Sequence, residues 1–148
     1  MKIADKDIPK GKQIQVDIPI SRLPSNTPID LVADVYRSPE EGPTLLLIGG
    51  VHGDEVNGIE IVKRAVKSDL VTTIERGTVI SVPLLNVYGF INYARGLPDG
   101  KDVNRSFPGR KNGSLASRVA YSFTHNILPL ADFALDFHTG GASVYNYP

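Results

Sequence analysis

The pattern of apolar positions along the chain predicts five β-strands. Apolar and polar side chains alternate over residues 14–20, and residues 31–36, between turn signals, form a second strand-like run. Both are predicted to be half-buried strands that pair antiparallel at the edge of a sheet. Residues 45–48 are a continuous apolar run typical of a buried strand, residues 78–82 are predicted to be another buried strand, and a fifth strand is predicted over residues 133–137.

Two segments have the period of an amphipathic helix. The first runs from Ile59 to about Ser68. The second follows Ser114, a residue type that caps helix N-termini, and ends before Pro129. Strands that alternate with helices predict an α/β fold with a mainly parallel sheet and helices on both faces. The apolar stripes are formed by Ile59, Val62, Ala65, Val66 and Leu70, and by Leu115, Val119, Phe123 and Ile127.

Two stretches have no clear period. Residues 1–12 are polar and are expected to be loose. Residues 86–113 form a long segment rich in Gly, Pro, Asn, Asp and Arg, and a loop of this length inside a compact domain is usually functional or disordered. No internal repeat or domain boundary interrupts the pattern, so residues 1–148 are predicted to lie within one domain.

Composition narrows the class of protein. The chain has 148 residues, of which 41% are hydrophobic and 22% charged, as is typical of one globular domain with its own core. The formal net charge is zero and there is no basic cluster, so neither nucleic acid nor an acidic membrane is expected as a partner. The first residues lack the apolar core of a signal peptide, and no apolar run approaches the ~20 residues of a membrane span. Cytoplasmic location is the default expectation, and the sequence leaves the oligomeric state open.

The first buried strand ends in a glycine-rich turn, residues 49–58, that presents His52 and, three residues later, Glu55. Ligands in open α/β sheets bind beyond the carboxyl ends of the strands, where this turn is expected to lie. The last predicted strand ends in a second glycine-rich turn that begins with His138. Two histidines and one glutamate that leave a position for water form a standard catalytic zinc set, although the same ligands also suit iron.

Neighbouring residues allow structural as well as functional interpretations. Asp136 lies two positions before His138 and so on the same strand face, from which it can orient a ligand imidazole. Asp54 can do the same, or simply cap the following helix. In the structural interpretation, His52 and His138 bond to backbone groups while the glycines only make tight turns. His125 lies in mid-helix without a companion and is expected to be a surface or internally hydrogen-bonded residue.

The long loop carries side chains suited to binding a carboxylate. Arg105 offers a planar fork that binds a carboxylate with two hydrogen bonds, and Asn104 adds a neutral donor beside it. Arg95, if it lies near a metal-bound carbonyl, can stabilise the oxyanion of a tetrahedral intermediate. The alternative is that these are surface arginines, with Asp102 pairing locally with Arg105.

Four motifs follow one another along residues 44–142. They are Gly-Gly-Val-His52-Gly-Asp-Glu55, then Asn86, then Asp102-Val-Asn104-Arg105-Ser-Phe-Pro-Gly, and finally Asp136-Phe-His138-Thr-Gly. In identity and order they resemble the succinylglutamate desuccinylase/aspartoacylase family, a branch of the zinc carboxypeptidase-like metallohydrolases. The resemblance implies a three-layer α/β/α sandwich around a mixed sheet.

The resemblance also implies a role for each residue of the site. One zinc ion per chain would be held by His52, Glu55 and His138. Asn104 and Arg105 would hold the substrate carboxylate, and Arg95 would polarise the scissile carbonyl.

One feature departs from the family pattern. Family members use a glutamate well beyond the third zinc ligand as general base, and no acidic residue follows Asp136 in this chain. We therefore expect residues 1–148 to be the N-terminal part of one catalytic domain from a longer protein, either truncated or partly proteolysed. Such a fragment is expected to leave an unpaired sheet edge or an apolar patch.

Together these expectations predict a zinc-dependent amidohydrolase that cleaves the amide of a small N-acyl amino acid with a metal-activated water. A metallocarboxypeptidase acting on a peptide C-terminus uses the same metal chemistry and is the nearer alternative. The farther alternative is a non-catalytic module that holds a carboxylate ligand, which the missing general base favours for residues 1–148 taken alone.

Overall fold

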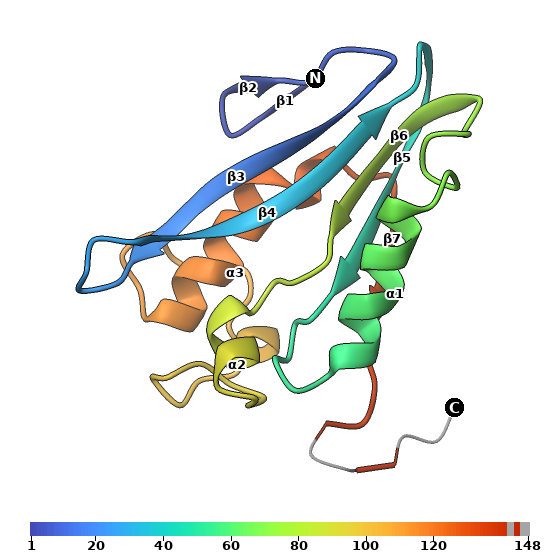
Figure 1. Ribbon diagram of the computed structural model, residues 1–148. Coiled ribbons are helices and arrows are strands. Elements are labelled where there is room, and N and C mark those ends of the chain that lie inside the picture. The colour runs from blue at the N-terminus through green and yellow to red at the C-terminus, as the bar shows by residue number, and fades with distance from the viewer. Residues whose placement is uncertain (142–143, 146–148) are drawn as a thin grey trace.

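The computed structural model describes residues 1–141 and 144–145, which form a five-stranded sheet, a short hairpin and three α-helices (Figure 1). The strands are β1 (Lys2–Ile3), β2 (Lys6–Asp7), β3 (Lys12–Arg22), β4 (Pro28–Arg37), β5 (Glu40–Gly49), β6 (Arg76–Val82) and β7 (Phe133–Phe137). The helices are α1 (Val56–Lys67), α2 (Val87–Ile91) and α3 (Leu115–Asn126), with 3-10 turns at Val103–Arg105 and Leu128–Leu130. All five predicted strands and both predicted helices are therefore confirmed.

The main sheet is mixed, with the strand order β3-β4-β6-β5-β7. β3 pairs antiparallel with β4 at the edge, as predicted, and β4 pairs antiparallel with β6. β5 pairs parallel with both β6 and β7, so the parallel part of the sheet is centred on β5. Because parallel strands end at the same edge of a sheet, the turns after β5 and β7 leave it side by side.

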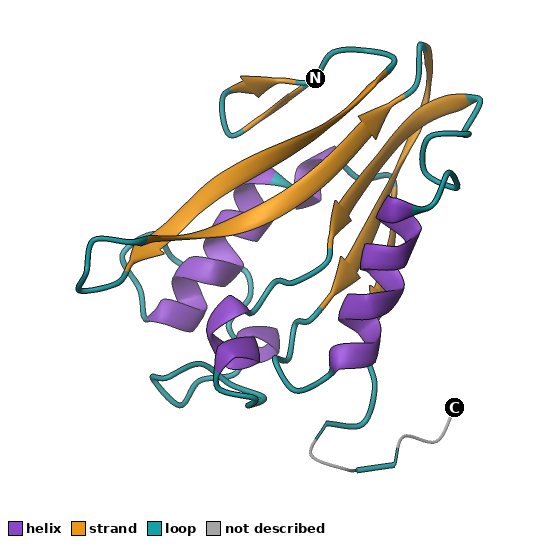
Figure 2. Ribbon diagram, in the orientation of Figure 1, coloured by secondary structure: helices purple, strands orange, loops and turns teal. Residues whose placement is uncertain are grey.

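Helices cover both faces of the sheet, which confirms the predicted three-layer arrangement (Figure 2). Side chains of β5 alternate between the two faces: Leu46 and Ile48 join the core under α3, whereas Leu47 joins the cluster under α1. The core residues of α1 and α3, Val62 and Val119, are 0% and 1% exposed. β5 is therefore buried from both sides, which explains its continuous apolar run.

The expectation of a loose N-terminal segment is wrong. β1 and β2 pair antiparallel, and the backbone N–H of Ile8 donates to the carbonyl of Met1 at 3.0 Å. Ile3 and Ile8 are 1% and 2% exposed and belong to the same core cluster as Val16 and Phe123. Two isolated isoleucines among charged residues give no periodic signal, and only the tertiary fold brings them to the core.

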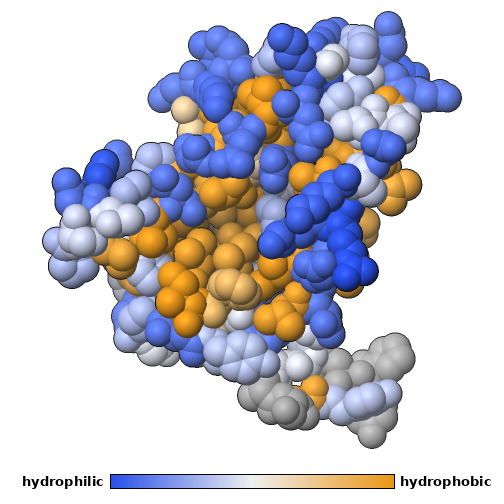
Figure 3. Space-filling view, viewed as in Figure 1, coloured by the Kyte–Doolittle hydropathy of each residue, from blue (hydrophilic) through white to orange (hydrophobic). Residues whose placement is uncertain are grey.

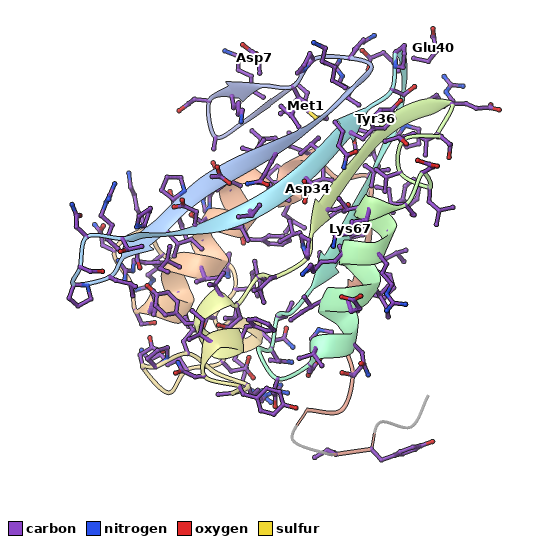
Figure 4. The ribbon with its side chains drawn as sticks, viewed as in Figure 1. Met1, Asp7, Asp34, Tyr36, Glu40 and Lys67 are labelled. Carbon is purple, nitrogen blue, oxygen red and sulfur yellow. The ribbon has the colours of Figure 1, made fainter. Side chains whose placement is uncertain are left out.

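A shallow apolar hollow lies beside α1 on the face seen in Figure 3. It encloses about 290 Å³ between β4, α1 and the start of α2, with Ile59, Val66 and Phe90 among its lining residues. Asp34 of β4 and Lys67 of α1 line it from two sides (Figure 4). Burial, and secondarily the neighbouring Asp17, raise the pKa of Asp34 above its ordinary value.

The outer edge of β7 has no strand partner among the described residues. Its Phe133 and Leu135 are 64% and 51% exposed, as expected for an uncovered apolar edge. Within the described part of the chain, no helix is both long enough and apolar enough to cross a bilayer.

Gly58 sets the distance between α1 and β7. A Cβ atom placed on it would lie 2.2 Å from the carbonyl oxygen of Phe137, so a larger residue would force α1 away from the strand. We expect Gly58→Ala to lower the free energy of unfolding by about 1–3 kcal/mol, measured by urea denaturation. Ile61→Ala, in the same helix but 47% exposed, is the matched control and should have a clearly smaller effect. Equal effects of the two substitutions would contradict this packing argument.

Candidate metal centre

The turn after β5 buries two of the predicted ligands. His52 and Glu55 are 2% and 3% exposed, and the backbone N–H of Glu55 donates to the carbonyl of His52 at 3.4 Å. The turn packs directly on α2, because a Cβ atom on Gly53 would lie 1.9 Å from the carbonyl carbon of Gly89. Glycine at this position therefore lets two backbone segments touch where any side chain would separate them.

The turn after β7 supplies the third predicted ligand. Gly49 of β5 lies opposite Phe137 of β7 in the parallel register, so His138 emerges beside the first turn. The backbone N–H of Thr139 donates to Oε2 of Glu55 at 3.0 Å, which ties the second turn to the first.

The structure brings the three predicted ligands together. Nδ1 of His52 lies 2.6 Å from Oε1 of Glu55, and Nδ1 of His138 lies 2.9 Å from Oε2 of the same carboxylate. One ligand atom from each of the three residues can be chosen so that all lie within 4.8 Å of one another. The two imidazole rings are 4.9 Å apart between centroids. His125, by contrast, is exposed, and its Nδ1 lies 2.9 Å from the carbonyl oxygen of Tyr121 in α3.

A carboxylate also faces the far nitrogen of each ligand ring. Oδ2 of Asp136 lies 2.9 Å from Nε2 of His138, in the position from which it was predicted to orient a ligand imidazole. Oδ1 of Asp102 lies 3.3 Å from Nε2 of His52, a close approach without the alignment of a full hydrogen bond. Sequence reasoning missed the contact of Asp102. The one feature of the sequence that could have pointed to this contact is that Asp102 is the first residue of the Asp102–Arg105 motif.

Asp102 carries a stabilised negative charge. Burial by itself raises the pKa of its carboxyl group, but the backbone N–H of Asn104 and the electrostatic interactions with His52 and Arg95 outweigh that effect. The pKa of Asp102 is consequently lower than its ordinary value, and the group is a carboxylate at neutral pH.

The loop residues predicted to bind substrate are only partly gathered at the site. Nε of Arg95 lies 3.0 Å from Oδ2 of Asp102, and its Nη1 lies 3.8 Å from Oε1 of Glu55. Asn104 lines the same pocket as Arg95. The side chain of Arg105 is 85% exposed, lies 4.0 Å from Asp102 and is absent from the pocket lining.

Asn86, the single-residue motif, fixes the start of the loop. It is fully buried, its Oδ1 accepts from the backbone N–H of Gly89, and its Nδ2 donates to the carbonyl of Arg95 at 3.1 Å. This side chain therefore caps α2. It also holds the backbone of Arg95 near the metal-ligand turns, that is, the two turns that carry the predicted ligands His52, Glu55 and His138.

These residues surround one cavity of about 470 Å³, with the three predicted ligands, Arg95 and Asn104 in its lining. Asp54 also lines it, and a Cβ atom on Gly141 would lie 2.4 Å from Oδ2 of Asp54, so the second turn packs against this carboxylate. No hydrogen bond from Asp54 to either ligand histidine is found among the described residues, and its Oδ1 is buried without a hydrogen-bond partner there. The predicted role of Asp54 in orienting a ligand thus has no supporting contact.

The sequence and the fold are both similar to known proteins. A model of the succinylglutamate desuccinylase/aspartoacylase catalytic domain matches residues 41–148. The N-alpha-acetyl-L-2,4-diaminobutyric acid deacetylase of Halomonas elongata is 42% identical over 105 residues, which cover 70% of this chain and 30% of the deacetylase.

Several solved structures share the arrangement described above. An aspartoacylase family protein from Mesorhizobium loti superposes with a TM-score of 0.79 at 32% identity, over 90% of this chain and 41% of its own. The product-bound ectoine utilization protein EutE (DoeB) from Ruegeria pomeroyi gives a TM-score of 0.75 at 31% identity, over 90% and 42% of the two chains. A metallo-carboxypeptidase from Burkholderia cenocepacia, 19% identical with a TM-score of 0.68, shares the fold.

The chain spans less than half the length of each of these relatives. The family model nevertheless covers well over half of the chain, and its residues 41–148 contain both metal-ligand turns and the arginine loop. By this match, the chain belongs to the succinylglutamate desuccinylase/aspartoacylase family.

Proposed function

We propose that the full-length protein carrying this chain is a zinc-dependent amidohydrolase that removes the acyl group from a small N-acyl amino acid. The observation that carries the proposal is the convergence of His52, Glu55 and His138 within 4.8 Å in a cavity that Arg95 and Asn104 also line. The family's description and the deacetylase activity named for the Halomonas elongata relative support an acyl-amide substrate.

The donor chemistry of the two histidines fits a metal ion. Each ring has both nitrogens directed at carboxylates: Nδ1 at Glu55, and Nε2 at Asp102 or Asp136. A neutral imidazole has only one N–H to donate, so it cannot satisfy two carboxylates by hydrogen bonding alone. A metal ion held by His52, Glu55 and His138 would resolve this mismatch, because each ring would keep one N–H to donate to its aspartate.

His52, Glu55 and His138 would hold the ion, and two imidazoles with one carboxylate are a common catalytic zinc set. When bound, zinc supplies Lewis acidity that lowers the pKa of water towards ~7 and polarises a carbonyl oxygen. Substrate binding and orientation would fall to side chains of the chain itself.

Arg95 and Asn104 are the residues available to bind and orient substrate. The Arg95 guanidinium lies at the cavity wall within 3.8 Å of Glu55, a position from which it can donate to a carbonyl oxygen as negative charge develops there. Asn104 presents a neutral amide to the same space and can donate to a substrate carboxylate. Arg105 starts from an exposed position, so its proposed carboxylate contact requires the side chain to turn inward.

Metal binding is the first test. We expect the full-length protein to contain about one zinc ion per chain, and His52→Ala to lose it because one of three protein ligands is removed. His125→Ala is the matched control and should retain the metal, since His125 bonds only within α3. Metal content is measured by inorganic mass spectrometry on purified protein. Equal zinc in the wild type and in His52→Ala would contradict the assignment.

Hydrolysis of N-acetyl amino acids, including N-acetyl-2,4-diaminobutyrate, is the second test. We expect Arg95→Ala to lower kcat/KM by roughly 10²–10³, since it removes a donor to the developing oxyanion. Arg64→Ala, whose side chain is 79% exposed on α1, should leave kcat/KM unchanged. Dipeptides are assayed in parallel. Preferred hydrolysis of dipeptides would instead identify a carboxypeptidase and overturn the proposed substrate class.

A further inference from the structure

The Asp102 carboxylate is the point at which the metal-ligand turns meet the arginine loop. Its Oδ1 lies 3.3 Å from Nε2 of His52 and accepts the backbone N–H of Asn104 at 2.8 Å. Its Oδ2 lies 3.0 Å from Nε of Arg95. One oxygen therefore faces a proposed metal ligand, and the other holds the residue proposed to act on the substrate carbonyl.

The backbone around Asp102 is also held by bonds that do not involve its side chain. The carbonyl oxygen of Asp102 accepts the backbone N–H of Arg105 at 3.2 Å and the hydroxyl of Ser106 at 2.8 Å. The carbonyl of Arg95 is held by Nδ2 of Asn86 at 3.1 Å. Removing the Asp102 carboxylate therefore leaves these backbone anchors in place while it breaks the side-chain link between Arg95 and His52.

We propose that Asp102 is a positioning residue that couples the placement of Arg95 to the affinity of the metal centre. The inference rests on the proposed function for its catalytic consequence, but the coupling itself can be measured by metal binding.

The physical basis is competition for one carboxylate. A carboxylate that accepts the Nε2–H of a ligand histidine fixes the ring and makes its other nitrogen a better donor to a metal. Arg95 attracts the same charge from the opposite side, at 3.0 Å. When Arg95 turns towards a substrate, more of the negative charge of Asp102 becomes available to His52. By reciprocity, a change in metal binding at His52 alters the position of Arg95.

Asp136 provides the matched control within the same site. It faces Nε2 of His138 at 2.9 Å, much as Asp102 faces His52, but no arginine contacts it among the described residues. A general weakening of the metal centre is therefore expected from substitution of either aspartate, whereas coupling to Arg95 is expected only for Asp102.

A pair of double-mutant cycles in the full-length protein tests the proposal. One cycle combines Asp102→Asn with Arg95→Ala, and the other combines Asp136→Asn with Arg95→Ala. Two quantities are measured in each: the zinc Kd by competition with a chelator, and kcat/KM for an N-acetyl amino acid at saturating zinc. Asp102→Glu, which retains a carboxylate, serves as the conservative variant, and circular dichroism checks the fold of every variant.

We expect both Asn substitutions to raise the zinc Kd by about 10-fold. The effect of Arg95→Ala on the zinc Kd and on kcat/KM should be at least about threefold smaller in the Asp102→Asn background than in the wild type. In the Asp136→Asn background it should be unchanged. At saturating zinc, Asp102→Asn should lower kcat/KM more than Asp136→Asn does, and Asp102→Glu should recover part of the activity that Asp102→Asn loses.

Additivity in the Asp102 cycle, or equal non-additivity in both cycles, would overturn the proposal. If Asp102→Asn does not fold, Asp102→Ser, which also lacks the carboxylate but can still cap the following turn, replaces it in the cycle, and additivity there would likewise refute the proposal. If the wild type hydrolyses no N-acyl amino acid, the proposed function fails. The zinc Kd cycle then decides the coupling by itself.

Discussion

The parallel pairing of β5 with β7 is the constraint on which the whole site depends. In this register Ile48 lies opposite Asp136, so the two glycine-rich turns leave the sheet at the same level. Residues 83 positions apart in the chain, Glu55 and His138, thereby come within 2.9 Å. A slip of one residue in β7 would send His138 and Asp136 to the other face of the sheet, because strand side chains alternate. The bond from the backbone N–H of Thr139 to Glu55 would be lost in such a slip and so favours the observed register.

Glycines let the surrounding elements approach that site closely. Gly53 lets the first turn touch α2, and Gly58 lets α1 touch the end of β7. A glycine inside a helix costs about 1 kcal/mol of helix stability relative to alanine, so Gly58 weakens α1 taken alone. The compensation is tertiary: α1 packs its buried Val62 on the sheet, and its N-cap residue is Glu55, itself a proposed metal ligand. Gly58 thus lowers the stability of α1 by itself but allows the helix to lie close to the end of β7.

Sequence periodicity was sufficient for the parts of the fold whose signals are local. The strands and helices followed from it, and His52, Glu55 and His138 were identified because they stand where apolar strands end in glycine-rich turns. The N-terminal hairpin could not be predicted, since Ile3 and Ile8 form no periodic pattern and are buried only because the fold brings them to the core. Likewise, nothing in the order of residues shows that Asp102 points at His52 while Arg105 points away. Those directions are set by contacts between the loop and the turns, which form only in the folded chain.

The charges of the site explain why the loop has to be held as it is. Glu55, Asp102 and Asp136 place three carboxylates around two imidazoles, and Arg95 is the permanent cation that contacts two of them. Like charges at this spacing repel, so the arrangement is stable only if positive charge is distributed among them. Arg95 neutralises the side of the cluster next to the loop, and the metal ion that we propose at His52, Glu55 and His138 would neutralise the other side. The arginine that we propose to contact the substrate therefore also helps to assemble the acidic cluster, and Asp102 is the residue that links these two roles.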